Sequence, residues 1–277
     1  MLPQGPYEPC FERMPYSVRV KNYPDMNIKV IASVKFCDLK YLWDVAKKST
    51  DGPILRTINL STDNHTLTLA TTDGSRIHTL DLGHSDEIIN VCVPEAFLKE
   101  VENAIKRLKL TPKNTQSLYF TPEEVSFVGV GKHGEVHLNS DYDGGQYPDW
   151  RPLVPQTHVT GLSITTKSLL DGLKDLAEGV GPQRVIKVST KDGRFFFEVY
   201  HPIWSGGVYI DGDITGDIDE PVQFAINVDY MIDAVKHVGN GVLTTYIRYR
   251  GPNSPVTFHS GNELCKALVM PVKITTR

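Results

Sequence analysis

Two stretches of the sequence have the residue types of ligand-binding loops. Residues 129–134 (Gly-Val-Gly-Lys-His-Gly) have the composition of a phosphate cradle, and the aspartates of 211–220 follow the start of a calcium loop. A phosphate loop must open a helix, however, whereas a strand-like run follows residue 134. In the acidic run, Val222 stands at the twelfth position, where calcium loops carry a bidentate glutamate. The first stretch therefore predicts a turn between strands and the second a solvated hairpin loop.

Other catalytic patterns are missing from the sequence. The nine histidines show no metal-binding spacing, and neither His65 nor His78 has a cysteine or acidic partner at a metal-site distance along the chain. No Gly-x-Ser-x-Gly elbow or comparable nucleophile motif is present. We expect no enzyme activity, no cofactor and no metal. A metal-dependent enzyme with its site at 211–220 is the alternative of another class.

Basic residues recur on the polar faces of the expected helices, several of them seven residues apart and so on one face. The cations are Lys40, Lys47, Lys48, Lys99, Lys106, Arg107, Lys167, Lys174 and Lys236, with His237 beside the last. Acidic residues such as Asp44 and Glu102 lie on the same helices. The pattern agrees with a solvated helix face and also with a surface that contacts the DNA backbone.

Apolar periodicity predicts the elements that would position these residues. Helices are expected at 38–48, 94–108, around 169–177, and at 227–238, with Pro94 at a first helical position and Asn227 as an N-cap. Strands are expected at 29–35, 54–60, 66–72, 76–82, 87–93, 117–121, 125–130, 135–140, 157–164, 184–190, 194–200, 208–210, 222–226, 242–250, 256–260 and 264–271, with a possible edge strand at 16–20.

These elements repeat in the order strand, helix, three strands. The two halves repeat at roughly 130 residues, and the two helices of each half are about 60 residues apart, so the chain contains four similar modules. Each module has one apolar helix stripe and one apolar sheet face. The predicted fold class is therefore α+β, with two domains that each pack two helices on curved antiparallel sheets.

A proline-rich stretch at 143–155 separates the halves. Pro148, Pro152 and Pro155 exclude a helix or a central strand there, while Tyr147 and Trp150 need something to pack against. We therefore expect a stiff connector rather than a flexible linker. The predicted parts are an N-terminal extension (1–27), a first domain (28–142), a connector (143–156) and a second domain (157–277).

The composition sets limits on the class of protein. At 277 residues the chain can form two ordinary domains, and its 40% hydrophobic and 22% charged residues are typical of a globular protein. No apolar run approaches a membrane span and no secretory signal is visible. Four widely spaced cysteines suggest reduced thiols and a cytoplasmic setting. The net charge of −4 leaves DNA contacts to local clusters of cations.

Four strings carry a resemblance to a known family. Residues 72–77 (TDGSRI), 147–151 (YPDWR), 225–235 and 268–274 (LVMPVKI) resemble, in order and spacing, the second and third domains of the bacterial DNA polymerase III β subunit, the sliding clamp. The family strings read TDGHRL, FPDYRR and VMPMRL. The chain departs from them at Ser75, where the family often has His, and at Pro152, where it often has a second basic residue.

The resemblance implies a DNA-clamp fold, a closed ring around duplex DNA and a role as polymerase processivity factor. Bacterial clamps have three domains per chain in a dimer, so a two-domain chain implies a homotrimer, in a bacterial cytoplasm or a phage-infected cell. The implied partners are double-stranded DNA without sequence preference, a replicative polymerase and a clamp loader. A DNA-tethered platform for transcription or repair factors is the alternative.

The resemblance also implies a pocket that binds short apolar peptides of the partners. Carried over position by position, its residues are Thr72, Gly74, Arg76, Ile77, Pro148, Trp150, Leu153, Val256, Leu268, Met270 and Val272.

Overall fold

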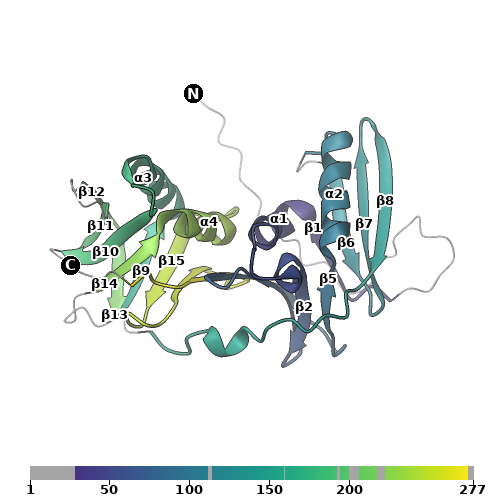
Figure 1. Ribbon diagram of the computed structural model, residues 1–277, viewed down its shortest axis with the longest axis horizontal. Helices are drawn as coiled ribbons and strands as arrows, with labels where there is room; N and C mark the ends of the chain where they lie inside the picture. The colour runs from purple at the N-terminus through teal and green to yellow at the C-terminus, as the bar shows by residue number, and fades with distance from the viewer. Residues whose placement is uncertain are drawn as a thin grey trace. The chain divides into compact units, whose positions relative to one another are not determined.

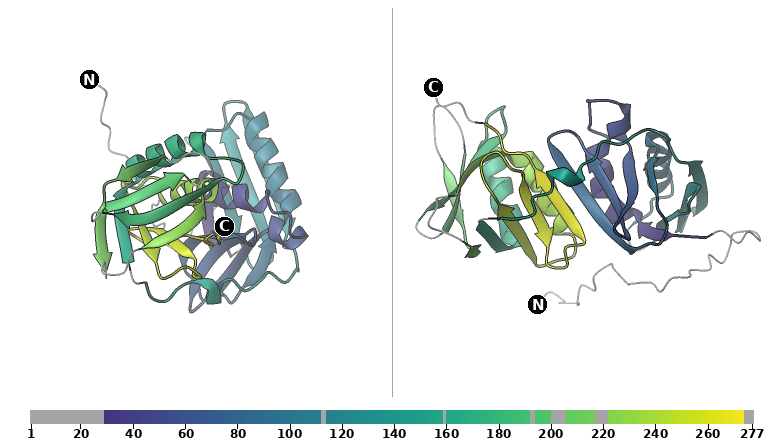
Figure 2. Two further views of the ribbon diagram at one scale, coloured as in Figure 1. Left: turned by 60° about the vertical axis from the view of Figure 1, so that its left-hand side comes forward. Right: turned by 90° about the horizontal axis from the view of Figure 1, so that it is seen from below.

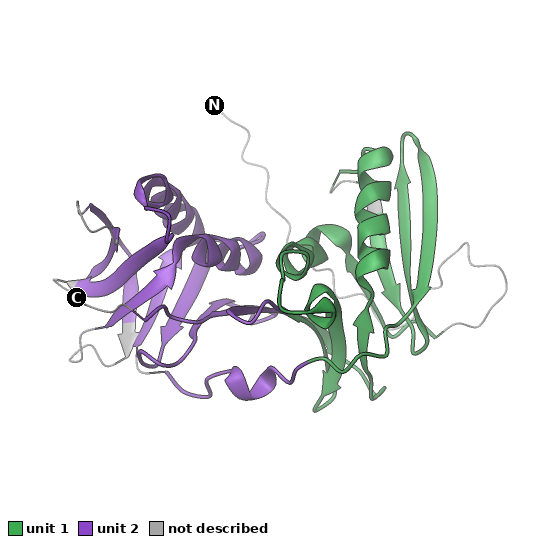
Figure 3. Cartoon of the chain, viewed as in Figure 1, with its two compact units in different colours: residues 1–71, 80–147 green, residues 72–79, 148–277 purple. Residues whose placement is uncertain are grey.

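The computed structural model describes residues 29–111, 114–158, 160–191, 194–199, 206–216 and 222–273. The possible edge strand at 16–20 lies outside these ranges, as do Asp217 and Asp219 of the acidic run. The chain forms two compact units (Figure 3): unit 1 comprises Met1–Thr71 and Leu80–Tyr147, and unit 2 comprises Thr72–Thr79 and Pro148–Arg277. The bounds of these units differ from the predicted domain limits 28–142 and 157–277, which stay a prediction.

The described part of unit 1 contains two α-helices and most of eight strands (Figure 1). They are β1 (Ala32–Lys35), α1 (Phe36–Ala46), the 3-10 helix η1 (Pro53–Arg56), β2 (Ile58–Asp63), β3 (Thr66–Thr72), β4 (Arg76–His84), β5 (Asn90–Val93), α2 (Glu95–Arg107), β6 (Thr115–Phe120), β7 (Glu124–Gly131) and β8 (Gly134–Asp141). The first residues of β4 belong to unit 2.

The described part of unit 2 contains the other two α-helices and the remaining strands. They are the 3-10 helix η2 (Arg151–Leu153), β9 (Thr160–Thr165), α3 (Thr166–Gly179), β10 (Val185–Lys191), β11 (Arg194–Val199), β12 (Gly207–Ile210), β13 (Asp213–Gly216), β14 (Gln223–Asn227), α4 (Val228–Val238), β15 (Thr244–Tyr249), β16 (Val256–Ser260) and β17 (Cys265–Val269).

Each unit packs its helices against antiparallel sheets. In unit 1 the strand orders are β1-β6-β7-β8 and β4-β3-β2-β5, and in unit 2 they are β12-β11-β10-β14 and β13-β9-β15-β16-β17-β4. Helices α1, α3 and α4 each contact strands of both sheets in their unit. Helix α2 lies along β7 and β8, as Figure 2 also shows. Among the described residues, no helix is both long and apolar enough to cross a membrane.

The repeat predicted from the sequence is present. The four modules are β1-α1-β2-β3-β4, β5-α2-β6-β7-β8, β9-α3-β10-β11-β12 and β14-α4-β15-β16-β17, with β13 as an additional strand among the described residues. The predicted α+β class is confirmed. The turn between strands that was predicted at 129–134 is confirmed: Gly131 ends β7, Gly134 begins β8 and pairs with it, and residues 132–133 form the turn.

Helix α4 illustrates why these residues form these elements. Asn227 accepts hydrogen bonds from the backbone amides of Asp229 and Tyr230, so the predicted N-cap is confirmed. Met231 and Val235 are fully buried (0% exposed) on the apolar stripe of the helix. The stripe faces the sheet that contains β16 and β17. One sheet face and one helix stripe thus form a continuous apolar layer.

The structure corrects several predicted boundaries. Residues 54–60 are not one strand, because Pro53 starts η1 after Gly52 at φ 135° and β2 begins only at Ile58. Pro94 is the N-cap of α2 rather than its first residue. Helix α1 ends at Ala46, so Lys47 and Lys48 lie beyond it rather than on its polar face.

The acidic run also differs from its prediction. Residues 213–216 form β13, which pairs with β9, so this part is a strand and not a loop. The Arg194 guanidinium lies 2.6 Å from the Asp211 carboxylate. Asp211 therefore has a cationic side chain as its partner.

Glu102 connects the two helices of unit 1. Its carboxylate accepts a 2.8 Å hydrogen bond from the buried Trp43 indole nitrogen of α1 and lies 3.1 Å from the Lys106 ammonium. Lys47 lies 3.5 Å away. Burial raises the pKa of Glu102, but the Trp43 hydrogen bond and the two lysines outweigh it and lower the pKa to about 2. The ionised carboxylate therefore stabilises the folded unit.

We expect Glu102→Gln to lower the free energy of unfolding by about 1–3 kcal/mol at pH 7. The folded pKa is below the ordinary value of 4.5, so the contribution is present above pH 4.5 and is lost as the pH falls toward 2. Urea unfolding followed by circular dichroism measures the difference at each pH. Glu100→Gln, at an exposed position of the same helix, is the control. Equal stability of the two variants at pH 7 would contradict the assignment.

Candidate functional site

The turn at residues 72–76 is held by its own polar side chains. Asp73 accepts hydrogen bonds from the backbone amides of Ser75 and Arg76, both at 3.1 Å. The Thr72 hydroxyl donates to the Arg76 carbonyl at 2.7 Å and accepts from the Gly74 amide at 3.1 Å. Gly74 has φ 86°, a conformation that favours glycine. Thr72, Asp73 and Gly74 thus hold this turn through two side chains and one positive φ.

Arg76 is the most constrained residue of the turn. Its side chain is 2% exposed and lies 2.9 Å from Asp73 and 2.8 Å from Asp233 of α4. Its guanidinium also lies 4.2 Å from the centroid of the Tyr230 ring. Two carboxylates and one aromatic face compensate the burial of the charge. Arg76 therefore ties the turn to α4 within unit 2.

The connector forms a second part of the predicted pocket. Trp150 precedes η2, and the amides of Leu153 and Val154 donate to the carbonyls of Trp150 and Arg151, each at 3.0 Å. The Trp150 indole nitrogen is buried and has no hydrogen-bond partner among the described residues. A buried hydrogen-bond donor without a partner destabilises the folded protein. A ligand that offers an acceptor to the Trp150 indole nitrogen would therefore bind more tightly.

All eleven predicted pocket residues belong to unit 2, and the structure separates them by exposure. The large apolar side chains at the surface are Leu153 (53% exposed), Met270 (40%) and Val272 (38%), which we call the apolar shelf. Val256 and Leu268, in contrast, are 0% and 2% exposed. The chain after β17 is held by backbone bonds from Met270 to Ser75 and from Val272 to Ala225.

The positions of the other predicted pocket residues follow the same division. Gly74 and Pro148 are exposed and Trp150 is partly exposed, whereas Thr72, Arg76 and Ile77 are buried.

Most of the predicted DNA-contacting cations are exposed and ion-paired. On the helices, Asp44 pairs with Lys40 and Lys47, and Glu102 and Glu95 pair with Lys106 and Lys99. In unit 2, Asp171 pairs with Lys167 and Lys174 of α3. Arg107 and Lys236 are exposed and have no ion-pair partner within the described ranges. Most of the predicted cations are therefore partnered by carboxylates of the same helices.

His237 is an exception to the predicted polar faces. It is 1% exposed and stacks on His78, with ring centroids 4.8 Å apart, and its Nε2 lies 2.8 Å from the Thr79 carbonyl. Burial lowers its pKa to about 4, so the ring is neutral near pH 7. His78 is also fully buried. The prediction of a polar helix face for His237 is therefore wrong, and both histidines belong to the core of unit 2.

The structure also brings together a group that sequence spacing did not indicate. His65, His84 and Asp86 place ligand atoms within 4.8 Å of one another in unit 1. All three side chains are exposed. No motif points to this group, because its members come together only through the β2–β3 hairpin and the end of β4.

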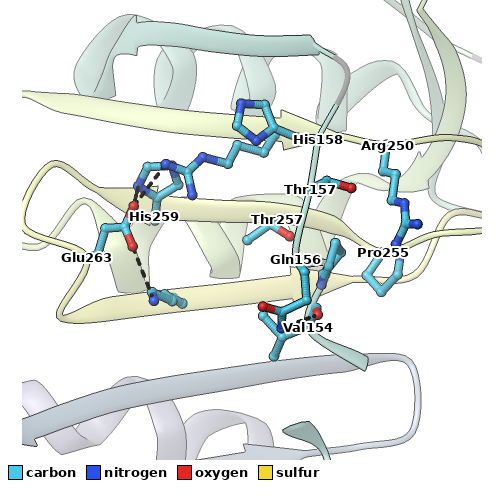
Figure 4. A pocket seen from close by; sticks show the side chains of 12 residues that line it. Val154, Gln156, Thr157, His158, Arg250, Pro255, Thr257, His259 and Glu263 are labelled. Atoms are coloured by element: carbon cyan, nitrogen blue, oxygen red, sulfur yellow. Dashed lines mark hydrogen bonds and ion pairs between the residues drawn. The ribbon is translucent and has the colours of Figure 1, made fainter. Parts of the chain in front are cut away.

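A polar groove on unit 2 was not anticipated either. It has a volume of about 290 Å³ and is formed by the connector residues 154–158 and by strands β15–β17 (Figure 4). Its charged side chains are those of Arg248, Arg250, Lys266 and Glu263. His158 and His259 also line it. The sequence does contain one signal for it: Arg248 and Arg250 alternate on the predicted strand 242–250, which puts both on one face.

The architecture defines the class of protein to which this chain is similar. Two units, each built from two strand-helix-three-strand modules with helices against antiparallel sheets, form the DNA-clamp fold. In solved structures this fold occurs in the sliding clamp of Bacillus subtilis, with a TM-score of 0.71 and 21% identity over 93% of this chain and 69% of that chain. A DNA polymerase III β chain from Streptococcus pneumoniae gives a TM-score of 0.68 and 19% identity over 92% of this chain and 68% of that chain.

Curated proteins show the same relationship in sequence. The β sliding clamp of Bacillus subtilis is 25% identical over 231 residues, or 80% of this chain and 57% of the relative. That of Synechococcus elongatus is 25% identical over 230 residues, or 80% of this chain and 58% of the relative. No family model matches the chain. The resemblance to bacterial β clamps is confirmed, and the chain spans less than two thirds of the length of these curated relatives.

We expect Arg76→Met to lower the free energy of unfolding by about 2–4 kcal/mol, because Asp73 and Asp233 would lose the cation that compensates them. Arg151→Met is the matched control, since Arg151 is partly exposed and lies 3.5 Å from the exposed Asp149. Its expected effect is within about 0.5 kcal/mol. Urea unfolding of the full chain measures both. A small effect of Arg76→Met would show that the ion pairs do not hold the turn.

Proposed function

We propose that this chain is a ring-forming DNA sliding clamp, a polymerase processivity factor that encircles duplex DNA. The observation that carries the proposal is the clamp fold across 93% of the chain, together with sequence similarity to β sliding clamps over 80% of it. The protein acts by topology and not by catalysis: a closed ring stays on DNA without tight contacts. Its place of action is the compartment that holds the replicating DNA.

Six domains close the ring in this proposal. The matched region covers 57–58% of the length of the two curated relatives, and two copies of such a longer chain would close the ring. A chain with two units needs three copies. The chain is then a homotrimer. Its helices face the DNA, and the cations on and beside these helices attract phosphates without reading bases. Because carboxylates screen most of these cations, the attraction is weak enough for the ring to slide.

Partners bind to unit 2 in this proposal. A replicative polymerase and a clamp loader insert short apolar peptides at the apolar shelf, beside the turn at residues 72–76. Three exposed apolar side chains, one of them the adaptable Met270, and the unpartnered indole nitrogen of Trp150 support this role. Buried Leu268 forms the base of the pocket, on the sheet face that points away from α4, whereas Val256 shares the α4-facing side with Phe258 and belongs to the core.

A trimer predicts a mass of about 93 kDa, three times the 30.9 kDa of one chain. Sedimentation equilibrium at micromolar protein without DNA measures it. A stable species near 31 or 62 kDa (one or two copies of the 30.9 kDa chain) would refute the trimer.

DNA contact through the helices predicts a weaker affinity for DNA when unpaired cations are removed. The double variant Arg107→Gln/Lys236→Gln should bind a fluorescent duplex several-fold more weakly at low salt. The slope of log K against log salt should become shallower by about 1 or more. Lys132→Gln/Lys187→Gln, which removes one cation per unit from strand regions, is the control and should bind within about twofold of wild type. An equal loss in the control would place the DNA surface elsewhere.

A further inference from the structure

The polar groove of unit 2 lies on the sheet face that points away from α4. Strand register aligns Ile247, Phe258 and Ala267 in one row, and these buried residues face α4. The neighbouring rows point to the opposite face. These rows contain Arg248, Thr257 and Leu268, and next to them Tyr246, His259 and Lys266. The groove is therefore separate from the helix surface proposed to contact DNA.

The groove carries excess positive charge. Glu263 is its one carboxylate among the described lining residues, and it lies 2.9 Å from Arg248 and 3.3 Å from Lys266. Arg250 is exposed and has no ion-pair partner among the residues that the structure describes. Three cations against one carboxylate give a local net charge of +2 with neutral histidines, on a chain of net charge −4. Such a local excess favours an anionic ligand.

His259 supplies a second, independent indication of a ligand. Its ring is 4% exposed and stacks on Tyr246, with centroids 5.2 Å apart. Its Nδ1 lies 3.0 Å from the Ser260 carbonyl, while its buried Nε2 has no hydrogen-bond partner in the described structure. Because Nδ1 donates to the Ser260 carbonyl, Nε2 of the neutral ring is an acceptor, and a backbone amide of a bound peptide would satisfy it.

The groove adjoins the apolar shelf. Val154 of the groove follows Leu153 of the shelf in the chain, and Thr257 of the groove is the register partner of Leu268, two positions before Met270 of the shelf. Met270 of the shelf is four positions after Lys266 of the groove, or about 13 Å along an extended strand. An extended peptide covers this distance with about three to five residues.

We propose that this cationic groove binds acidic side chains of a partner peptide whose apolar side chains contact Leu153, Met270 and Val272. The occupant is an extended peptide with an aspartate or glutamate about three to five residues from its apolar anchor. Arg250 supplies the unpaired cation, and Arg248 and Lys266 share their charge with Glu263. This inference rests on the proposed partner-binding function and adds the chemistry of the partner.

The test begins with a phage-displayed library of random twelve-residue peptides, selected on the full-length chain. The expected peptides combine an apolar pair with Asp or Glu at that spacing. In a selected peptide, replacing the acidic residue by its amide should weaken binding to the wild-type chain about tenfold, measured by fluorescence anisotropy. The same replacement should change binding to the Arg250→Gln variant less than about twofold, because the partner of the carboxylate is missing.

Matched variants keep the test specific. Arg250 is exposed, so its replacement leaves the fold intact, which circular dichroism checks. Lys187→Gln removes the same charge from β10, and it should keep the tenfold preference for the acid. In a charge swap, Arg250→Glu should prefer a peptide that carries Lys in place of the acidic residue.

The outcomes separate the two proposals. Peptides that bind through apolar residues with no acid preference overturn the groove assignment and leave the clamp proposal standing. Failure to select any peptide argues against partner docking at this face altogether. Binding of a labelled oligonucleotide that is lost in Arg250→Gln, without an acidic-peptide preference, assigns the groove to nucleic acid and overturns the inference.

Discussion

Each α-helix in the described part of the chain has an apolar side, and burying that side requires a sheet face. In unit 2, α4 places Met231 and Val235 against strands β16 and β17, where Phe258 and Ala267 complete the apolar layer. This constraint divides each helix and each sheet into an inner and an outer side. The outer side of the helices is free to carry cations, and the outer side of the sheet is free to bind ligands.

The charges on the helix faces form a network rather than a row of free cations. Asp44, Glu102 and Asp171 each pair with two lysines, and Glu102 also holds the Trp43 indole. Exposed pairs of this kind contribute little to stability, about 0.3–0.5 kcal/mol each. Their main effect is to hold the lysine ammonium groups beside carboxylates, which limits the positive charge that the helix surfaces present. A protein that must hold DNA and still move along it needs such a balance.

The turn at residues 72–76 shows how one sequence string can serve both structure and function. Thr72, Asp73 and Gly74 satisfy the local hydrogen bonds and the positive φ, and Arg76 fastens the turn to α4. The same turn holds the amide of Met270 through the Ser75 carbonyl and so positions the chain segment of the apolar shelf. The string at residues 72–76 resembles a binding motif, and its side chains make the contacts that build the turn.

The sequence by itself determined the modules. The four helix stripes, the hairpin turns and the order of strand and helix are local patterns with periods of 3.6 and 2, so the α+β class and the repeat could be predicted. It did not determine every strand, because the strand at 213–216 forms by pairing with β9, about 50 residues away in the chain. For the candidate pocket, the sequence supplied only the residues that belong to the motifs at 72–77, 147–151 and 268–274, and their role stays a prediction. Tertiary structure alone decided that Val256 is core, that His78 and His237 are buried together, and that Arg250, His259 and Lys266 meet in one groove. These residues lie on different strands, and only the register of an antiparallel sheet brings them side by side.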